Sequence, residues 1–221
     1  MTRIAAFRPG ATALLLWLLA LGAAPAAQAQ LAQVTEAGRQ AILAHPATPF
    51  AGSPTADVTV VEYLDFNCPY CKKAAVTLRQ LMAADAKIRV LYKDWPIFGG
   101  VSDYAARATL AAGWQGKALA AHNILIDTPS RLASETQVRE RLAFAGVDLA
   151  QLDRDLAAHE SAIAAILARN DNEARALSFT GTPGMVIGDL VVPGALGLDD
   201  LRQLAAIARR APAAPGGQRR S

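Results

Sequence analysis

The chain reads VTVVEYLDFNCPYC from residue 58 to residue 71, and this stretch holds the only two cysteines among 221 residues, Cys68 and Cys71. The preceding run, residues 58–64, is apolar and β-branched, which predicts a strand buried in a sheet. A disulfide between cysteines this close in sequence closes too short a loop to restrain much of the unfolded chain. The pair is therefore interpreted as a redox centre.

The residues after the cysteines complete a βαβ pattern. Residues 72–83 have the apolar spacing of an amphipathic helix, and residues 88–92 predict a second strand. From Ser102 to about Ser178 the chain is rich in alanine and predicts helices near 103–114, 116–127, 134–145 and 148–176, the last of them broken.

The C-terminal part predicts two strands and a closing helix. Residues 185–187 and 190–192 are short apolar strands joined by Gly188-Asp189, a two-residue hairpin signal, and a helix follows over residues 198–210. The predicted fold is therefore α/β: a thioredoxin fold with an all-helical insertion between its βαβ and ββα halves. Its predicted parts are a signal peptide (1–29), an N-terminal helix and linker (30–54), a thioredoxin-like domain (55–101 and 179–210), the inserted helical domain (102–178) and a disordered tail (211–221).

The N-terminus has the pattern of a secretory signal peptide. Arg3 and Arg8 give a positive start, residues 11–21 give an apolar core, and Ala27 to Ala29 give a cleavage site before Gln30. The alternative is an uncleaved membrane anchor, but the apolar run is short for a span that needs about 20 residues. Export with cleavage is therefore predicted.

The charge balance argues against a nucleic-acid surface. The chain carries 22 basic and 19 acidic side chains, and two of the basic ones, Arg3 and Arg8, belong to the predicted signal peptide. The remaining chain is close to neutral, so nothing indicates a basic patch.

Three segments together resemble the DsbA-like thiol:disulfide oxidoreductases of bacterial envelopes, and most closely their ScsC-like branch: residues 61–71, residues 92–97 (YKDWPI) and residues 180–183 (TGTP). The resemblance extends from about Gly52 to Arg210. It implies a thioredoxin core with a helical insertion, a periplasmic location, exchange of disulfides with cysteine-containing client proteins, and a membrane partner that recycles the cysteine pair.

The chain departs from this family in two ways. Gly184 follows Pro183, at a position where the family tends to carry a side chain. Some ScsC-like proteins form trimers through a long N-terminal stem, whereas here only residues 31–44 are available, fewer than the three or four heptads of a coiled coil. A monomer is therefore predicted.

Cys68 is predicted to be the nucleophile and Cys71 the resolving cysteine. Pro69 suits the first helical position because its missing N–H would have no helical partner there. The free N–H groups of Tyr70 and Cys71, with the helix dipole, favour a thiolate on Cys68. A stabilised thiolate also stabilises the reduced form, which makes the disulfide a stronger oxidant. Pro69 and Tyr70 would tune the reduction potential of the cysteine pair. Both residues are also assigned to the client-binding surface.

Glu62 interrupts an apolar strand six residues before Cys68. The family resemblance implies a buried carboxylate there, beneath the active-site disulfide. Burial raises the pKa of a carboxyl group, so Glu62 could accept the proton of Cys71. The alternative is a glutamate at a strand end that faces solvent. Lys93 is either a partner of Glu62 or a plain surface lysine.

Thr182-Pro183 is the third predicted element of the site. By sequence alone the peptide bond is expected to be trans, because only about 5–6% of X-Pro bonds are cis. The family resemblance implies a cis-proline that faces the cysteines, with Thr182 tuning specificity and its backbone free to pair with an extended client. The apolar residues 95–98 either line a groove for client segments or pack against the inserted helices.

Two other interpretations of the cysteine pair involve a metal ion. A structural zinc site needs four ligands, and none of His45, His122 and His159 has ligand spacing to the cysteines, so no metal and no cofactor are predicted. Transient Cu(I) binding to two thiolates is chemically reasonable. The alternative function is therefore a copper-binding or thiol-protecting envelope protein with little turnover. The sequence does not separate oxidase, isomerase and reductase roles.

Overall fold

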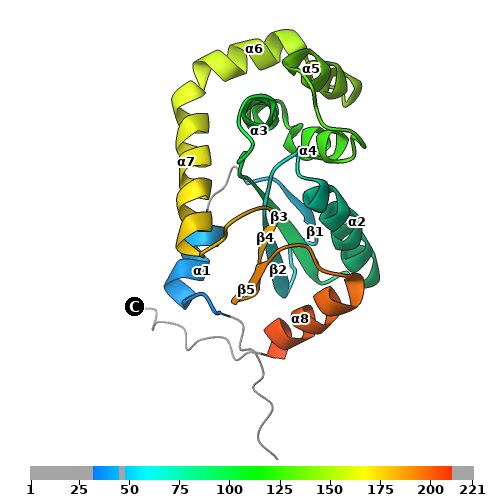
Figure 1. Cartoon of the computed structure of the whole chain (residues 1–221), viewed down its shortest axis with the longest axis vertical. Helices are drawn as coiled ribbons and strands as arrows, with labels where there is room; N and C mark the ends of the chain where they lie inside the picture. The colour runs from blue at the N-terminus through cyan, green and yellow to red at the C-terminus, as the bar shows by residue number, and fades with distance from the viewer. Residues whose placement is uncertain (1–31, 45–47, 211–221) are drawn as a thin grey trace, which may run out of the picture. The chain divides into compact units, whose positions relative to one another are not determined.

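The computed structural model describes residues 32–44 and 48–210, in which the elements follow the predicted β-α-β, helical and β-β-α order (Figure 1). The strands are β1 (Phe50–Gly52), β2 (Val58–Leu64), β3 (Ile88–Asp94), β4 (Gly184–Ile187) and β5 (Leu190–Pro193). The helices are α1 (Glu36–Leu43), α2 (Pro69–Ala84), α3 (Val101–Ala111), the 3-10 helix η1 (Ala112–Gln115), α4 (Ala118–Ile126), α5 (Glu135–Phe144), α6 (Leu149–Ala158), α7 (Glu160–Ala176) and α8 (Leu198–Arg210).

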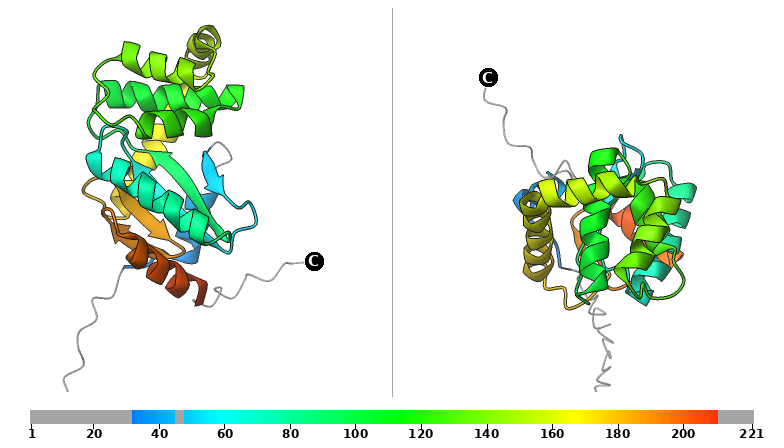
Figure 2. Two further views of the ribbon diagram at one scale, coloured as in Figure 1. Left: turned by 90° about the vertical axis from the view of Figure 1, so that its right-hand side faces the viewer. Right: turned by 90° about the horizontal axis from the view of Figure 1, so that it is seen from above.

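The five strands form one mixed sheet in the order β1-β3-β2-β4-β5. β2 and β3 are parallel, as their connection through α2 requires, and the other neighbouring strands are antiparallel. Helices α2 and α8 cover one face of the sheet, whereas α1 and the end of α7 lie on the other (Figures 1 and 2). Helices α3 to α6 gather at the end of the sheet where β2 and β3 finish (Figure 1).

The inserted helices and the sheet share one hydrophobic core. A single cluster joins Val60 of β2, Leu78 of α2 and Leu201 of α8 to insertion residues such as Leu125 and Leu142. A second, smaller cluster packs the opposite face of the sheet against α1 and α7. The end of β2, which leads into the cysteine motif, therefore lies between these two hydrophobic clusters.

A short strand occurs where the sequence predicts only loop. β1 pairs antiparallel with β3, with Phe50 opposite Leu91. Gly52 ends this strand with a φ of +90°, and a Cβ there would lie 2.4 Å from the Ile88 carbonyl oxygen. A strand of three residues that ends in glycine carries too little alternation to be detected from the sequence.

The predicted signal peptide, its cleavage site before Gln30 and the predicted tail over 211–221 lie outside the described residues. Among the residues that the structure does describe, no helix is both long and apolar enough to cross a membrane.

The absence of a side chain after Pro183 has a structural reason. A Cβ on Gly184 would lie 2.4 Å from Cδ2 of Phe179, which is closer than real Cβ contacts. The Phe179 ring is 5% exposed and packs against Tyr63 at a centroid distance of 5.7 Å. Phe179 therefore fills the space that a side chain at position 184 would need.

We expect Gly184→Ala to destabilise the fold by about 1–3 kcal/mol, because the added methyl group overlaps a packed ring. Phe179→Leu should relieve part of this cost, so the double variant should be more stable than the sum of the two single effects predicts. Urea midpoints of the four proteins measure this coupling. Additive effects would show that the two positions do not compete for the same space.

Candidate active site

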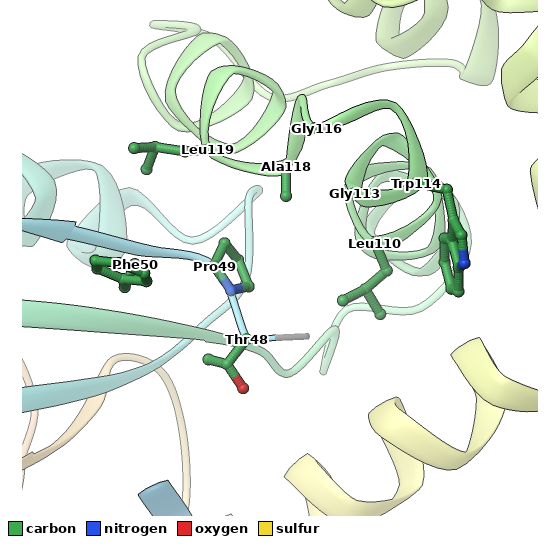
Figure 3. Close-up of a pocket in the computed structure, with 9 residues that line it drawn as sticks. All are labelled: Thr48, Pro49, Phe50, Leu110, Gly113, Trp114, Gly116, Ala118 and Leu119. Carbon is green, nitrogen blue, oxygen red and sulfur yellow. The ribbon is translucent and has the colours of Figure 1, made fainter. Parts of the chain in front are cut away.

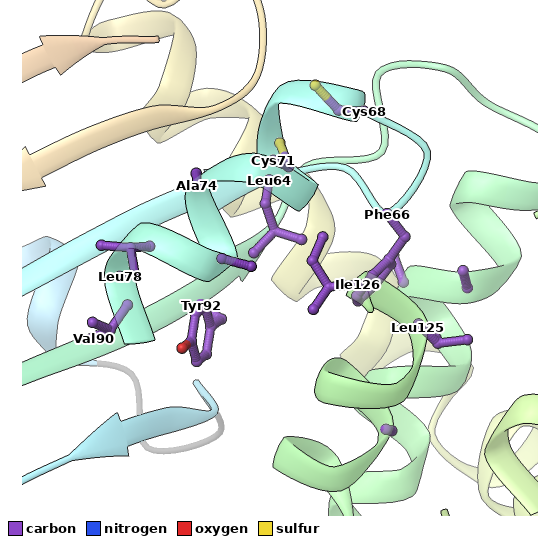
Figure 4. Packing of buried hydrophobic residues seen from close by; sticks show 14 of the residues in the cluster. Leu64, Phe66, Cys68, Cys71, Ala74, Leu78, Val90, Tyr92, Leu125 and Ile126 are labelled. Carbon is purple, nitrogen blue, oxygen red and sulfur yellow. The ribbon is translucent and has the colours of Figure 1, made fainter. Parts of the chain in front are cut away.

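The two cysteines lie at the start of α2. Cys68 is the N-cap residue, with φ −79° and ψ 119°, and Pro69 follows at the first helical position. Figure 4 shows both sulfur atoms at this end of the helix, at the border of the buried cluster that contains Leu64. Cys68 is 3% exposed and Cys71 is fully buried, and both are free thiols. Cys68 is thus the sulfur nearer to solvent.

The surroundings of Cys68 favour its thiolate. A hydrogen bond from the Cys71 thiol is the main cause that lowers the pKa of Cys68, to about 6, against the opposing effect of burial. The N–H groups of Cys71 and Tyr70 also contribute to this lowered pKa. Burial raises the pKa of Cys71 far above its usual range, and the hydrogen bond to Cys68 adds to this effect. The two thiols therefore differ sharply in acidity.

Glu62 of β2 is buried beneath these thiols, not exposed at a strand end. Its side chain is 1% exposed, and Oε1 has no hydrogen-bond partner among the described residues. Burial, with a smaller contribution from the negative charges of Cys68 and Asp94, raises the pKa of Glu62 to about 8. A carboxyl group with this pKa can both hold and release a proton near neutral pH.

Lys93 does not pair with Glu62, and it is not a surface lysine, so both expectations for it are wrong. In the parallel register Glu62 lies opposite Tyr92, and Tyr63 lies opposite Lys93. Because side chains alternate along a strand, Lys93 points to the other face of the sheet. There it is 1% exposed and forms an ion pair with Glu173 of α7, which also accepts a hydrogen bond from the Tyr63 hydroxyl at 2.9 Å.

Asp94 is a second buried carboxyl group that the sequence analysis missed. By register it shares the face of Glu62, two residues beyond Tyr92. It is 2% exposed, and neither carboxylate oxygen has a hydrogen-bond partner among the described residues. Burial raises the pKa of Asp94 well above its usual value, and the charge of Asp65 adds to this increase. Burial and neighbouring negative charges thus act in the same direction on the pKa values of Glu62 and Asp94.

The Thr182-Pro183 segment lies against the cysteines. Its peptide bond is cis, as the family resemblance implied and contrary to the expectation from sequence alone. The Cys68 thiol donates a hydrogen bond to the Thr182 carbonyl at 3.1 Å. Thr182 is half-buried, and its hydroxyl has no partner among the described residues. Pro69 and Tyr70 are exposed on the same helix end as Cys68.

The loop over residues 95–98 divides between the two predicted roles. Trp95 is buried, and its indole N–H donates to Asp171 of α7 at 2.8 Å, so it packs against the insertion. Ile97 and Phe98 are 41% and 47% exposed. A hollow of about 460 Å³ follows this loop and α7, lined by Trp95, Pro96, Ile97, Asp103, Arg107, Ala164, Leu167, Ala168, Asp171 and Arg175.

A second pocket, of about 440 Å³, lies between β1 and the η1–α4 region and is lined largely by apolar residues, among them Phe50 and Trp114 (Figure 3). Neither the CPYC residues nor Glu62, Thr182 or Pro183 line it. The residues that line this pocket are therefore different from those of the thiol site.

Neither of the two histidines that the structure describes, His122 and His159, forms a metal-binding cluster with the cysteines. His122 is buried and stacks on Tyr92 with ring centroids 3.8 Å apart, and burial lowers its pKa to about 3. His159 stacks on Trp114 at 4.0 Å, and His45 lies outside the described residues. Within residues 32–44 and 48–210 no group of three or more His, Cys, Asp or Glu side chains is placed to hold a metal ion.

Comparison with known proteins identifies the family. The model of the DSBA-like thioredoxin domain matches residues 59–206, and the chain belongs to this family. The predicted DsbA-like membership and the thioredoxin-like fold are therefore confirmed. This fold is one that carries thiol–disulfide oxidoreductase activity in general.

Solved structures agree with this assignment. A thioredoxin-like oxidoreductase from Silicibacter pomeroyi DSS-3 is 41% identical, with a TM-score of 0.74 over 78% of this chain and 98% of that chain. The catalytic domain of Proteus mirabilis ScsC is 26% identical, with a TM-score of 0.68 over 78% of this chain and 95% of that one. BcfH from Salmonella enterica Typhimurium is another neighbour, at 27% identity and a TM-score of 0.66, covering 77% of each chain.

The curated relatives are much longer proteins. The Na(+)/H(+) antiporter NhaA 1 of Salinispora arenicola is 34% identical over 136 residues, which are 60% of this chain and 20% of that protein. The matched region thus spans about a fifth of the length of these relatives.

The pH dependence of the folding stability should reveal that Glu62 is buried. A folded-state pKa of about 8, above the usual 4.5, means that folding favours the protonated form. Its contribution to stability is present below pH 4.5 and is lost as pH rises through about 8. We expect Glu62→Gln to gain about 4 kcal/mol relative to the reduced wild-type protein between pH 4 and pH 8.

Glu140→Gln is the matched control, because Glu140 is exposed on α5. Chemical denaturation of the three reduced proteins at both pH values gives the comparison. A Glu62→Gln curve parallel to that of wild type across this range would mean that Glu62 ionises freely in the folded protein.

Proposed function

We propose that this protein is an exported thiol:disulfide oxidoreductase of the periplasm, which exchanges its CPYC disulfide and dithiol with cysteines of client proteins. The observation that carries the proposal is the pairing of a Cys68 thiol of low pKa with a buried Cys71 thiol of high pKa at the start of α2. Family membership supports the general chemistry.

In the oxidising direction a client thiolate attacks Cys68 Sγ of the CPYC disulfide. A mixed disulfide forms between the client and Cys68, and Cys71 leaves as a thiolate. A second client thiolate then attacks the client sulfur of the mixed disulfide and displaces the Cys68 thiolate. The client loses two electrons and gains a disulfide, and the protein gains two electrons as its dithiol. A Cys68 thiolate with a pKa of about 6 is a good leaving group in this last step.

Isomerisation begins from the dithiol. The Cys68 thiolate attacks a client disulfide and releases one client thiolate, which can then attack another client disulfide. Whenever Cys71 leaves the CPYC disulfide or attacks a mixed disulfide, it must change its protonation state without direct access to water, because it is fully buried. Glu62 is the group that we assign to this proton: it protonates the leaving Cys71 thiolate and accepts the proton when Cys71 attacks.

The client-binding surface is assigned to Thr182, Pro183, Pro69 and Tyr70. The Thr182 carbonyl lies 3.1 Å from Cys68 Sγ, so a client strand paired with this backbone would bring its sulfur to the nucleophile. Tyr70 is 60% exposed and offers an apolar face beside it. These contacts use backbone and one aromatic ring, which suits clients of varied sequence.

The catalytic cycle requires a second redox partner. After client oxidation the dithiol must return two electrons and two protons, and we assign this step to a membrane protein that presents a disulfide to Cys68. A periplasmic thioredoxin-like protein of Salmonella enterica serovar Typhimurium, 25% identical with a TM-score of 0.67, supports the proposed location. We propose that the protein acts as a monomer.

Cysteine variants test the exchange reaction directly. We expect oxidised wild-type protein to oxidise a reduced two-cysteine client peptide. We expect reduced Cys71→Ser to attack the disulfide form of the same peptide and to accumulate a mixed disulfide with it, because Cys71 is absent and cannot resolve it. Cys68→Ser should form none. Iodoacetamide should label Cys68 half-maximally near pH 6, compared with about 8.5 for a free thiol.

Each result has a counterpart that would contradict the proposal. Labelling of Cys68 with the pH midpoint of a free thiol would remove the basis of its reactivity. Tight Cu(I) binding by both thiols, together with client oxidation no faster than by free glutathione disulfide, would favour the copper-binding or thiol-protecting role.

The role of Glu62 predicts a kinetic effect on chemistry, not on client binding. Glu62→Gln should lower kcat by about 100-fold, because general acid–base catalysis contributes at this scale, and should leave KM near its wild-type value. The pH dependence of kcat should lose its inflection near pH 8. Equal kcat and an unchanged pH profile in the variant would exclude Glu62 from proton transfer.

A further inference from the structure

The turn between β2 and α2 is tied to the insertion by a buried carboxylate. Asp65 is 1% exposed, and its Oδ1 accepts a hydrogen bond from Ser102 Oγ of α3 at 2.8 Å. Its Oδ2 accepts one from the Phe98 N–H at 3.1 Å. Inside the turn, Oδ1 also accepts the Asn67 N–H at 2.7 Å, and the Asp65 carbonyl accepts the Cys68 N–H at 3.0 Å. The start of the turn is therefore fixed.

Asn67, directly before Cys68, ties the end of the turn to a different part of the insertion. The Leu132 N–H donates to Asn67 Oδ1 at 2.7 Å, and Asn67 Nδ2 donates to the Leu132 carbonyl at 3.3 Å. Asn67 is 4% exposed and Leu132 is 2% exposed, so water cannot readily replace these bonds. The Asn67 amide thus both accepts a hydrogen bond from the Leu132 backbone and donates one to it, as a neighbouring β-strand would.

Lys72 binds the same loop from the other side of Cys68. Its Nζ donates to the Thr128 carbonyl at 2.5 Å and to the Ser130 carbonyl at 3.3 Å. The loop over residues 128–132, between α4 and α5, is thus bound at residues 67 and 72, which bracket the CPYC motif.

We propose that Asn67 is a positioning residue of the redox centre: through its pairing with the Leu132 peptide, the helical insertion fixes the backbone that places the Cys68 sulfur at the start of α2. This inference rests on the proposed function and adds to it a structural determinant outside the CPYC motif. It also gives the insertion a part in the chemistry of a sulfur that belongs to the other part of the fold.

The Cys68 side chain makes no capping hydrogen bond to the first turn of α2, and no acidic residue lies in that turn. The position of the sulfur at this helix end therefore depends on the backbone of the turn that carries it. Hydrogen bonds from N–H groups weaken steeply as their angle departs from linear. A small rotation of the peptide between Asn67 and Cys68 would therefore move the sulfur away from the donors that stabilise its anion.

The chain offers a matched control. Asn170 is also a buried asparagine, 3% exposed, and it also joins the insertion to the sheet, because its Nδ2 donates to the Asp94 carbonyl at 3.0 Å. Asn67→Ala and Asn170→Ala both remove a buried side-chain amide that binds backbone. A purely structural effect should therefore be similar in the two variants.

The experiment titrates the Cys68 thiolate in the reduced full-length protein, by its absorbance at 240 nm and by the rate of iodoacetamide labelling without any client. We expect Asn67→Ala to shift the midpoint upward by about one pH unit and to slow labelling at pH 6 by about fivefold. Asn67→Ser keeps one hydrogen-bonding group, so it should fold more readily and shift the midpoint less. Asn170→Ala should leave both measurements unchanged.

The outcomes separate this inference from the proposed function. Wild-type titration at a low pH together with unchanged midpoints in both Asn67 variants would overturn the positioning role alone, and so would equal shifts in Asn67→Ala and Asn170→Ala. Wild-type titration as an ordinary thiol would instead overturn the proposed function. Should Asn67→Ala fail to fold, the Asn67→Ser midpoint decides between these results.

Discussion

The Cys68 sulfur stands where a helix N-terminus commonly takes a capping oxygen, and the rest of the site depends on that position. Pro69 starts α2 without needing a hydrogen bond of its own, which leaves the N–H groups of Tyr70 and Cys71 for the sulfur. The buried Cys71 thiol adds the strongest of these interactions. A thiolate held in this way is both a nucleophile and a leaving group, so one local geometry serves the exchange in both directions.

The two faces of the central strands handle charge in opposite ways. On one face Lys93, Glu173 and the Tyr63 hydroxyl form a paired network, in which each charge is compensated. On the other face Glu62 and Asp94 are buried with carboxylate oxygens that have no partner among the described residues. A buried carboxylate that is paired with a positive charge stays ionised, whereas a buried carboxylate without such a partner is protonated for much of the time. The face beneath the cysteines is thus the one suited to store a proton.

The sequence was sufficient to predict the elements of the fold that depend on a local residue pattern. The β-branched run before the cysteines, the helix after them and the hairpin at Gly188-Asp189 follow from periodicity and turn chemistry, and the order of elements then determined the fold class. The features that were missed depend on partners far along the chain. The partner of Lys93 lies 80 residues away on α7, and that of Asn67 lies 65 residues away. Which face Lys93 takes depends on the register of β3 against β2, and the sequence does not encode that register in any short window.

The use of both cysteines at the site also explains how the fold must be stabilised. The sequence contains no further cysteine that could form a stabilising disulfide. This chain instead relies on a core that runs without interruption from the sheet into the insertion, and on the buried polar ties at Asp65 and Asn67. The same contacts that hold the insertion in place therefore reach the turn that carries the nucleophile. A fold stabilised in this way connects the turn before Cys68 to the packing of the inserted helices.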